Sequence, residues 1–348
     1  MCELLGMSFN RPVKCGFSFR GLTGRSIDNP DGWGIALYPE GGKAVQVIKE
    51  PLKAESSKLA EFVKNYDFYS NIFLSHIRKA SSGSESYANT HPFIRELNGR
   101  EYAFAHNGTL SPDCREKLST GRWKPVGDTD TEFSFCYLLN MMGTIQPMWN
   151  DKSFVNLENI MKEINQYGKF NCLLTDGEYL FCYCDKDNRG GLRYTERKPP
   201  YNNIKLKDND IEVSLGEIKG PNEVGTIVAT NPLTKEFWPR ICQGTLTVFC
   251  AGKQVFSACK NSLEEKILHA LYTIRTSLCC VSVSVIADTI EVESSEVHRM
   301  LKPLIDEGLI RQDRRDSSEP FDSCSTYYTI KPKRDEIDRL LWGDISRK

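Results

Sequence analysis

The chain has 348 residues, of which 40% are apolar and 26% charged, and this is the composition of a folded globular protein. A chain of this length exceeds the usual size of one hydrophobic core, so we expect one large domain and one smaller domain. The formal net charge of −1 provides no global attraction to nucleic acid or anionic lipid, and no apolar run reaches the roughly 18 residues of a membrane helix.

In chain order the residue pattern predicts a hairpin of strands over 32–38 and 45–49, a helix over 55–66, strands over 71–77 and 102–106, a helix over 130–142, and strands over 170–175, 179–183, 225–229 and 245–249. Arg78 and Asn107 directly follow two of these strands, so polar side chains gather at strand ends. Many strands with few helices predict a layered α+β domain.

The C-terminal part of the chain has a different pattern, which begins within residues 252–261. Its predicted elements are helices over 263–276, 283–290 and 294–307 and strands over 309–312 and 326–330. This is the element order of a winged helix. The predicted domains are therefore 2–255, a smaller winged-helix-like domain over 262–332, and a helical tail over 333–348.

The N-terminus and the cysteines give expectations about the compartment and about metals. Glu3 and Asn10 interrupt any apolar run of an export signal, so we expect a cytoplasmic protein. The thirteen cysteines are odd in number, and without export we expect buried thiols rather than a disulfide framework. No cysteine or histidine spacing is typical of a metal site, and we expect neither a metal nor a cofactor.

Cys2 follows the initiator methionine, which aminopeptidases remove before small residues. A mature chain that begins with Cys2 would carry the thiol beside its own α-amine. A free α-amine has a pKa of about 7.7–8.0 and can accept the thiol proton, so the residue would be a nucleophile with a built-in base. A Met-Cys start alone is weak evidence for this chemistry.

Six motifs strengthen the case that Cys2 is a nucleophile: MCELLG at 1–6, DGWGIA at 31–36, SHIR at 75–78, NTHPF at 89–93, FAHNG at 104–108 and GDTDTE at 127–132. In order and spacing they resemble class II glutamine amidotransferases, most closely the stand-alone YafJ-like group. The resemblance covers residues 2–255. It implies a four-layer αββα Ntn-hydrolase sandwich.

The resemblance also implies catalytic roles. Cys2 would attack the side-chain amide carbon of glutamine, release ammonia and form a γ-glutamyl thioester that water cleaves. The Asn107 side-chain amide and the Gly108 backbone N–H would stabilise the oxyanion, although Asn-Gly is also the sequence of a plain hairpin turn. Arg78 would bind the α-carboxylate of the substrate in bidentate fashion.

Three further positions are candidate substrate-binding residues. Asp130 would bind the α-ammonium; it could instead cap the following helix, and Asp128 is a second candidate for the ammonium. His91 either lines the pocket or fixes its own loop by hydrogen bonds. Ser81 lies just after Arg78, in the pocket wall, where relatives carry threonine, histidine or glutamine.

The expected function is hydrolysis of glutamine. Because the residues after 255 are too few for a synthase domain, either the protein hydrolyses a γ-glutamyl substrate on its own or a separate subunit accepts the ammonia. One alternative is a γ-glutamyl peptide hydrolase of the glutathione type with a peptidase partner. Another is a nucleic-acid-binding regulator, which the charge disfavours, since residues 263–333 hold about nine Lys/Arg against about twelve Asp/Glu. A protein-interaction or homodimerisation role for the smaller domain is left open.

Overall fold

The computed structural model divides the chain into two compact units, Met1–Cys259 and Lys260–Lys348, which are described separately. In the first unit it describes residues 2–80, 83–144, 148–187, 191–201, 203–207, 212–234 and 238–259. In the second it describes residues 267, 268, 270, 271, 281–290, 292–306, 310–314 and 325–329.

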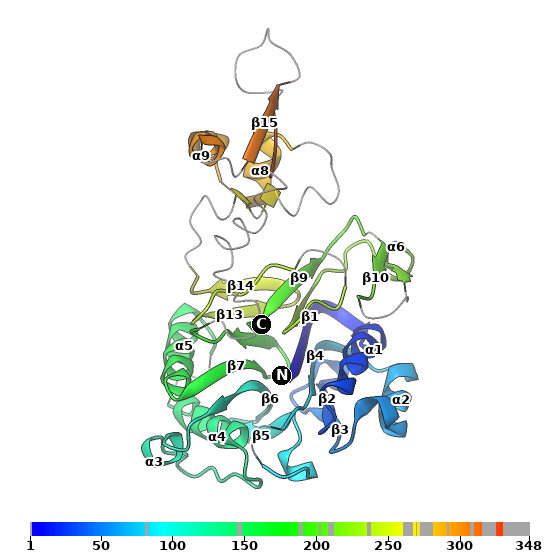
Figure 1. The fold of residues 1–348 in the computed structure, drawn as a ribbon, viewed down its shortest axis with the longest axis vertical. Coiled ribbons are helices and arrows are strands. Elements are labelled where there is room, and N and C mark those ends of the chain that lie inside the picture. The colour runs from blue at the N-terminus through cyan, green and yellow to red at the C-terminus, as the bar shows by residue number, and fades with distance from the viewer. Residues whose placement is uncertain are drawn as a thin grey trace. The chain divides into compact units, whose positions relative to one another are not determined.

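Two antiparallel sheets of six strands each form the centre of the first unit (Figure 1). The first sheet has the order β3 (Gln46–Glu50), β2 (Trp33–Leu37), β4 (Tyr69–Ile77), β1 (Glu3–Lys14), β12 (Gly225–Ala229), β9 (Arg193–Arg197). The second sheet has the order β14 (Lys253–Ser257), β13 (Leu246–Cys250), β8 (Tyr179–Tyr183), β7 (Gly168–Thr175), β6 (Arg100–Leu110), β5 (Phe93–Leu97). A small pair, β10 (Asn203–Lys205) and β11 (Glu212–Ser214), lies apart from both sheets.

The two sheets pack face to face. Leu4 and Leu74 from the first sheet and Ala105 and Leu173 from the second belong to one buried apolar cluster. Strand β1 is buried on both faces, because Leu5 and its alternate neighbours belong to a different cluster, on the outer side of the first sheet. Cys2, the residue before β1, is therefore held at the end of a central strand.

Helices cover both outer faces, which gives four layers (Figure 1). The helices of the first unit are α1 (Gly16–Thr23), α2 (Lys58–Asn65), α3 (Cys114–Lys117), α4 (Asp130–Met142), α5 (Asp151–Asn165) and α6 (Leu215–Ile218). Phe19 of α1 and Val63 of α2 pack on the first sheet, and Phe135 of α4 and Leu157 of α5 pack on the second. The layered α+β prediction is confirmed.

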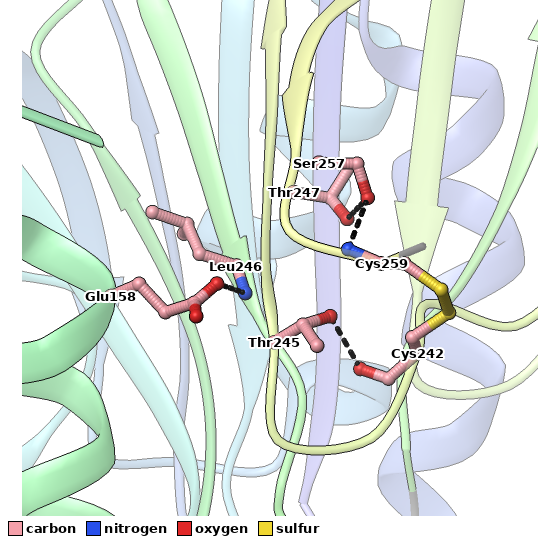
Figure 2. The surroundings of a disulfide bond; sticks show 7 residues. All are labelled: Glu158, Cys242, Thr245, Leu246, Thr247, Ser257 and Cys259. Carbon is pink, nitrogen blue, oxygen red and sulfur yellow. Dashed lines mark hydrogen bonds between the residues drawn. A yellow bond between two sulfur atoms is a disulfide. The ribbon is translucent and has the colours of Figure 1, made fainter. Parts of the chain in front are cut away.

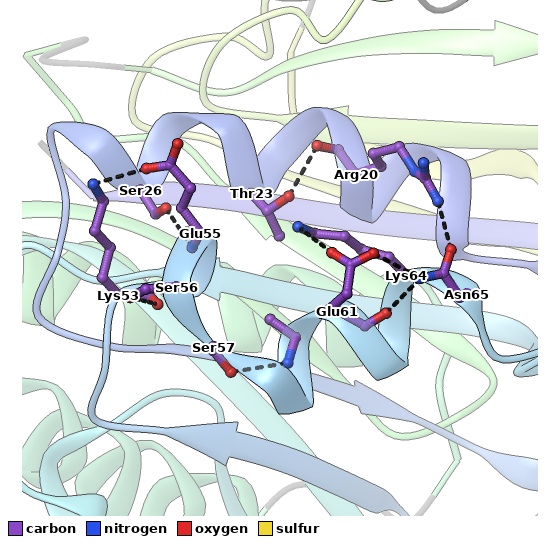
Figure 3. Close-up of polar contacts among 11 residues, drawn as sticks. Arg20, Thr23, Ser26, Lys53, Glu55, Ser56, Ser57, Glu61, Lys64 and Asn65 are labelled. Carbon is purple, nitrogen blue, oxygen red and sulfur yellow. Dashed lines mark hydrogen bonds and ion pairs between the residues drawn. The ribbon is translucent and has the colours of Figure 1, made fainter.

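One polar contact links α1 to α2, and another caps α2 (Figure 3). Arg20 donates to Asn65 Oδ1 at 2.9 Å. The Ser57 hydroxyl accepts the Ala60 N–H at 2.9 Å and so caps α2. This cap explains why the helix predicted over 55–66 begins only at Lys58.

The predicted strands and helices mostly agree with the observed ones, with one consequential difference. The helix over 130–142 and the strands over 179–183 and 225–229 have the predicted bounds. The strand predicted to end before Asn107 instead runs on to Leu110. The alternative that Asn107 and Gly108 form a hairpin turn is therefore wrong.

A disulfide joins Cys242, in the segment before β13, to Cys259, two residues after the end of β14 (Figure 2). Beside it, Leu246 N donates to the Glu158 carboxylate of α5 at 3.0 Å. The expectation of thiols is wrong for this pair, because the β13–β14 hairpin brings together two cysteines 17 residues apart. Six other cysteines are buried thiols as expected: Cys15, Cys114, Cys136, Cys172, Cys182 and Cys184.

The described part of the second unit includes α8 (Val283–Ile290), α9 (Ser294–Asp306) and the antiparallel pair β15 (Ile310–Arg314) and β16 (Ser325–Thr329). Ile286, Val297 and Leu301 belong to its own apolar core. The order helix, helix, strand, strand agrees with the order predicted, and the winged-helix assignment itself stays a prediction. Most of the helix predicted over 263–276 and all of the tail over 333–348 lie outside the described residues. No helix among the described residues is long and apolar enough to cross a bilayer.

Candidate active site

A pocket beside the start of β1 brings together five of the predicted site residues: Cys2, Arg78, His91, Gly108 and Asp130. Asn107 adjoins it, because its side-chain Nδ2 donates to the Cys2 carbonyl oxygen at 2.8 Å. Ser81 lies outside the described residues. Residues from four separate motifs of the sequence thus surround one sulfur atom.

The Cys2 thiol lies against the backbone of Lys79, the residue after Arg78. Sγ is 3.2 Å from the Lys79 carbonyl oxygen and 3.2 Å from the Lys79 nitrogen. Burial raises the pKa of the Cys2 thiol, while the Lys79 backbone contact and the charges of Arg78 and Lys169 lower it to a lesser degree. The resting group is therefore a neutral thiol at pH 7, and attack on a carbonyl requires a base.

The direction of the Gly108 N–H follows from the edge of β6. Strand β5 pairs with β6 only from Arg100 to Phe104, so beyond that point no described strand covers this edge. Leu110 donates its N–H away from β7, to the Asp130 carboxylate at 2.7 Å. Because N–H groups two residues apart on a strand point to the same edge, the Gly108 N–H also points out of the sheet, at the pocket that Gly108 lines.

Only glycine fits at position 108. A Cβ atom there would lie 1.9 Å from the Lys169 carbonyl oxygen and 2.3 Å from His106 Nε2. The close approach of β7, rather than an unusual backbone angle, excludes every side chain.

Arg78 is a buried cation next to the pocket, with only 3% of its surface exposed. Its guanidinium donates to the carbonyl oxygens of Asp31 at 3.3 Å and of Ser84 at 3.4 Å. Both contacts are long, and a carboxylate would accept shorter, charge-assisted bonds from the same group. The geometry therefore suits exchange of these carbonyls for an anionic substrate group.

Asp130 is the first residue of α4 and does not cap it. The hydroxyl of Thr129 accepts the Glu132 N–H at 3.2 Å, so Thr129 is the N-cap and the capping alternative for Asp130 is wrong. Asp128 is exposed and accepts a hydrogen bond from Asn89 at 2.6 Å, apart from the pocket lining. Of the two aspartates, only Asp130 is placed to meet a ligand in the pocket.

Three histidines are buried at the pocket: His91 and His106 line it, and His76 contacts His91. His91 Nδ1 lies 3.1 Å from His76 Nε2, and His106 lies between the Thr131 hydroxyl (2.9 Å) and the Lys169 carbonyl oxygen (3.1 Å). Because a carbonyl only accepts, His106 Nε2 carries the proton and Nδ1 accepts from Thr131. Burial lowers the pKa of His76 to about 3 and lowers those of His91 and His106. All three are neutral at pH 7 and contribute hydrogen bonds rather than charge.

Some neighbours of the site were not singled out from the sequence. Lys79 contacts the thiol through its backbone, which no side-chain pattern reveals. Thr131 lies within the GDTDTE motif, and its contact with His106 depends on the packing of α4 on β6. No group of His, Cys, Asp or Glu within the described residues is arranged to hold a metal.

Comparison with known proteins agrees with this geometry. The family model described as "Glutamine amidotransferases class-II" matches residues 1–271. The chain belongs to the class II glutamine amidotransferases. The amidotransferase unit thus carries the motifs, and the pocket lies within it.

Relatives of two lengths match this amidotransferase. An uncharacterized protein of Methanocaldococcus jannaschii is 46% identical over 351 residues, which cover 99% of this chain and 97% of the relative. The Escherichia coli protein YafJ is 39% identical over 262 residues, covering 73% of this chain and all of YafJ. The crystal structure of a predicted glutamine amidotransferase from Pseudomonas aeruginosa has 30% identity and a TM-score of 0.56, and covers 73% of this chain and all of that one.

Proposed function

We propose that this amidotransferase hydrolyses the side-chain amide of glutamine with Cys2 as an N-terminal nucleophile, after removal of Met1. The observation that carries the proposal is the open edge of β6, which directs the Gly108 N–H into the pocket that Cys2 also lines. A nucleophile and a fixed N–H donor facing one small pocket are the elements that acyl transfer needs.

The reaction has two stages, formation of a γ-glutamyl thioester and its hydrolysis. The α-amine of Cys2 accepts the thiol proton, and Sγ attacks the amide carbon of glutamine. The Gly108 N–H and the Asn107 amide stabilise the resulting oxyanion. The amine returns the proton to the departing nitrogen, so ammonia leaves and a γ-glutamyl thioester remains. Water, deprotonated by the same amine, then attacks the thioester and releases glutamate and the thiol.

Recognition of the α-substituents involves opposite charges on the pocket wall. Arg78 binds the α-carboxylate and Asp130 the α-ammonium, while His91 lines the wall; Ser81 is proposed as a further substrate-binding residue on the sequence alone. The burial of Arg78 supports this assignment, because a buried guanidinium loses little side-chain entropy when it binds a carboxylate.

The second unit adds a proposal about partners. We assign it to a winged-helix-like module that contacts another protein, either an ammonia-accepting subunit in the cytoplasm or a second copy of the chain. On α9, Arg299 and Lys302 are offset by Glu296 and Asp306, which disfavours strong binding to phosphates. A γ-glutamyl peptide remains the alternative substrate, because its γ-carbonyl and free α-carboxylate match those of glutamine.

One experiment tests nucleophile and substrate together. Purified protein is given glutamine, glutathione and other γ-glutamyl amides, and glutamate release is measured. A diazoketone analogue of glutamine should label Cys2 in a protein whose intact mass lacks Met1. Cys2→Ser and Cys2→Ala should abolish release. Full activity with Met1 retained, or in Cys2→Ala, would sink the mechanism.

A further inference from the structure

A buried polar chain lies behind Asn107, between the two sheets. Asn171 on β7 is directly opposite Asn107 on β6, and its side-chain Nδ2 donates to the Asn107 carbonyl oxygen at 3.3 Å. Its Oδ1 accepts the backbone N–H of Asp185 at 3.0 Å. Asn171 therefore links the backbone of Asn107 to the segment that follows β8.

The Asp185 side chain also holds strand β7, through hydrogen bonds that its carboxylate accepts. Its Oδ1 accepts the side-chain amide of Asn165 at 2.8 Å and the backbone N–H of Phe170 at 3.0 Å. Phe170 is the residue opposite Gly108 in the β6–β7 register. The carboxylate thus holds the strand position facing Gly108, while Asn171 holds the one facing Asn107.

Burying these three polar side chains costs free energy unless their donors and acceptors are paired in hydrogen bonds. Asn165, Asn171 and Asp185 are each 0% exposed. On the same face of β7, Leu173 is apolar and packs with Ala105 in the core between the sheets. A leucine at position 171 would continue that core without the cost of burying an amide.

We propose that Asn171 and Asp185 are positioning residues, which hold β7 and β6 in the register that aims the Asn107 amide and the Gly108 N–H at the oxyanion. The inference rests on the proposed function. Oxyanion donors act mainly in the transition state, so a small displacement of β6 lowers kcat and leaves KM nearly unchanged. Arg78 and Asp130, the proposed substrate-binding residues, lie on other elements; Asp130 is joined to β6 by the Leu110 N–H, three residues beyond Asn107, so KM is expected to change much less than kcat.

The test compares Asn171→Leu with a matched control, Thr175→Val. Thr175 lies on the same strand and face, is also 0% exposed, and its hydroxyl accepts the Gly177 N–H at 3.1 Å, away from Cys2. We expect Asn171→Leu to lower kcat for glutamine by about 10- to 100-fold, the range for a displaced or lost oxyanion donor, with KM within about twofold. Thr175→Val should lose stability while keeping kcat.

A second measurement distinguishes misplaced oxyanion donors from a general loss of folded structure. The γ-aldehyde analogue of glutamine forms a thiohemiacetal with Cys2, whose oxygen occupies the oxyanion position. Its binding by Asn171→Leu should weaken by the same factor as kcat/KM, whereas inhibition by the product glutamate should not change. If Asn171→Leu does not fold, Asp185→Asn and Asn171→Ser are measured in the same way.

The outcomes distinguish this inference from the proposed function. A wild-type protein that neither hydrolyses γ-glutamyl amides nor binds the aldehyde overturns the proposed function. An active wild type whose Asn171 and Asp185 variants keep kcat and aldehyde affinity within twofold overturns the positioning role alone.

Discussion

At the scale of single residues, one methyl group at position 108 is expected to be decisive. Gly108→Ala places Cβ within 1.9 Å of a backbone oxygen of β7, which no side-chain rotation relieves. We predict at least a 100-fold loss of glutamine hydrolysis, about the effect of a lost oxyanion donor, together with a lower melting temperature. Gly24→Ala is the control, because a Cβ there meets nothing within 4 Å. Similar activity in the two variants would contradict the assignment of Gly108.

Arg78 allows a prediction about affinity. Arg78→Lys keeps the charge and loses the planar pair of donors, so we predict that KM for glutamine rises about tenfold or more while kcat falls less. Steady-state kinetics measure this split. Arg20→Lys is the matched control, since the Arg20 guanidinium donates to Asn65 and Arg20 lies on α1, outside the pocket (Figure 3). A fall in kcat with unchanged KM would argue against carboxylate binding by Arg78.

At the scale of elements, the N-terminus of α4 connects stability to the site. Thr129→Ala removes the cap and should cost about 1 kcal/mol of stability, within a range of about 0.5–2. Ser57→Ala removes the corresponding cap of α2, remote from the pocket. We predict comparable losses in urea unfolding for both variants, and loss of glutamine affinity only for Thr129→Ala, because Asp130 follows it directly. An equal KM for glutamine in the two variants would contradict a role of the α4 N-terminus in substrate binding.

The elements also show what local sequence can predict. The β2–β3 hairpin and α4 were predicted because a Pro-Gly turn and a threonine cap mark their limits. Strand β1 was not predicted as an element, since it is buried on both faces and interrupted by a bulge between Ser8 and Val13. Helix α5 was missed although Asn150 and Ser153 form a capping box at its start.

Some residues of the site can likewise be predicted from local sequence, and others cannot. Cys2, Arg78, Gly108 and Asp130 lie in short motifs and were found through the family resemblance. Asn171 and Asp185 were not found, because their importance depends on which strand pairs with β6. The course of β6 through Gly108 likewise depends on β7, since Asn-Gly by itself favours a turn.

At the scale of the whole molecule, the buried histidines predict sensitivity to mild acid. A histidine whose folded pKa lies below its unfolded value of about 6.5 destabilises the fold as pH falls through 6.5, because only the unfolded chain then binds the proton. From pH 7.5 to 5.5 His76, whose folded pKa is about 3, should cost about 1.4 kcal/mol, and His91 and His106, whose pKa values burial also lowers, add losses of the same sign. Glu3, whose pKa burial raises, acts in the opposite direction and reduces the net loss.

Urea unfolding at the two pH values measures this loss. His76→Gln removes the group whose folded pKa is about 3, so its pH-dependent loss should be smaller than that of the wild type by about 1.4 kcal/mol, whatever its stability at pH 7.5. An identical pH dependence would mean that His76 is protonated in the folded protein.

The disulfide gives a prediction about thiol chemistry. Alkylation of the unfolded chain without reductant should leave Cys242 and Cys259 unlabelled, and peptide mapping should recover them as one linked pair. Closing a loop of this length contributes about 3 kcal/mol in the chain-entropy account, so a reductant should lower the melting temperature. Recovery of both cysteines as alkylated thiols would contradict the bond.

Strand β6 also acts as a ruler. The N–H groups of Gly108 and Leu110 lie on one edge, two residues apart, and thus about 6.8 Å from each other. Under the proposed roles the first meets the reacting carbonyl, and the second holds the aspartate that binds the α-ammonium. The backbone repeat then sets the length of the accepted side chain. Asparagine is one methylene shorter, so its side-chain carbonyl would not reach the Gly108 N–H when its α-ammonium is bound at Asp130. The residue spacing of β6 would then determine the selectivity for glutamine over asparagine.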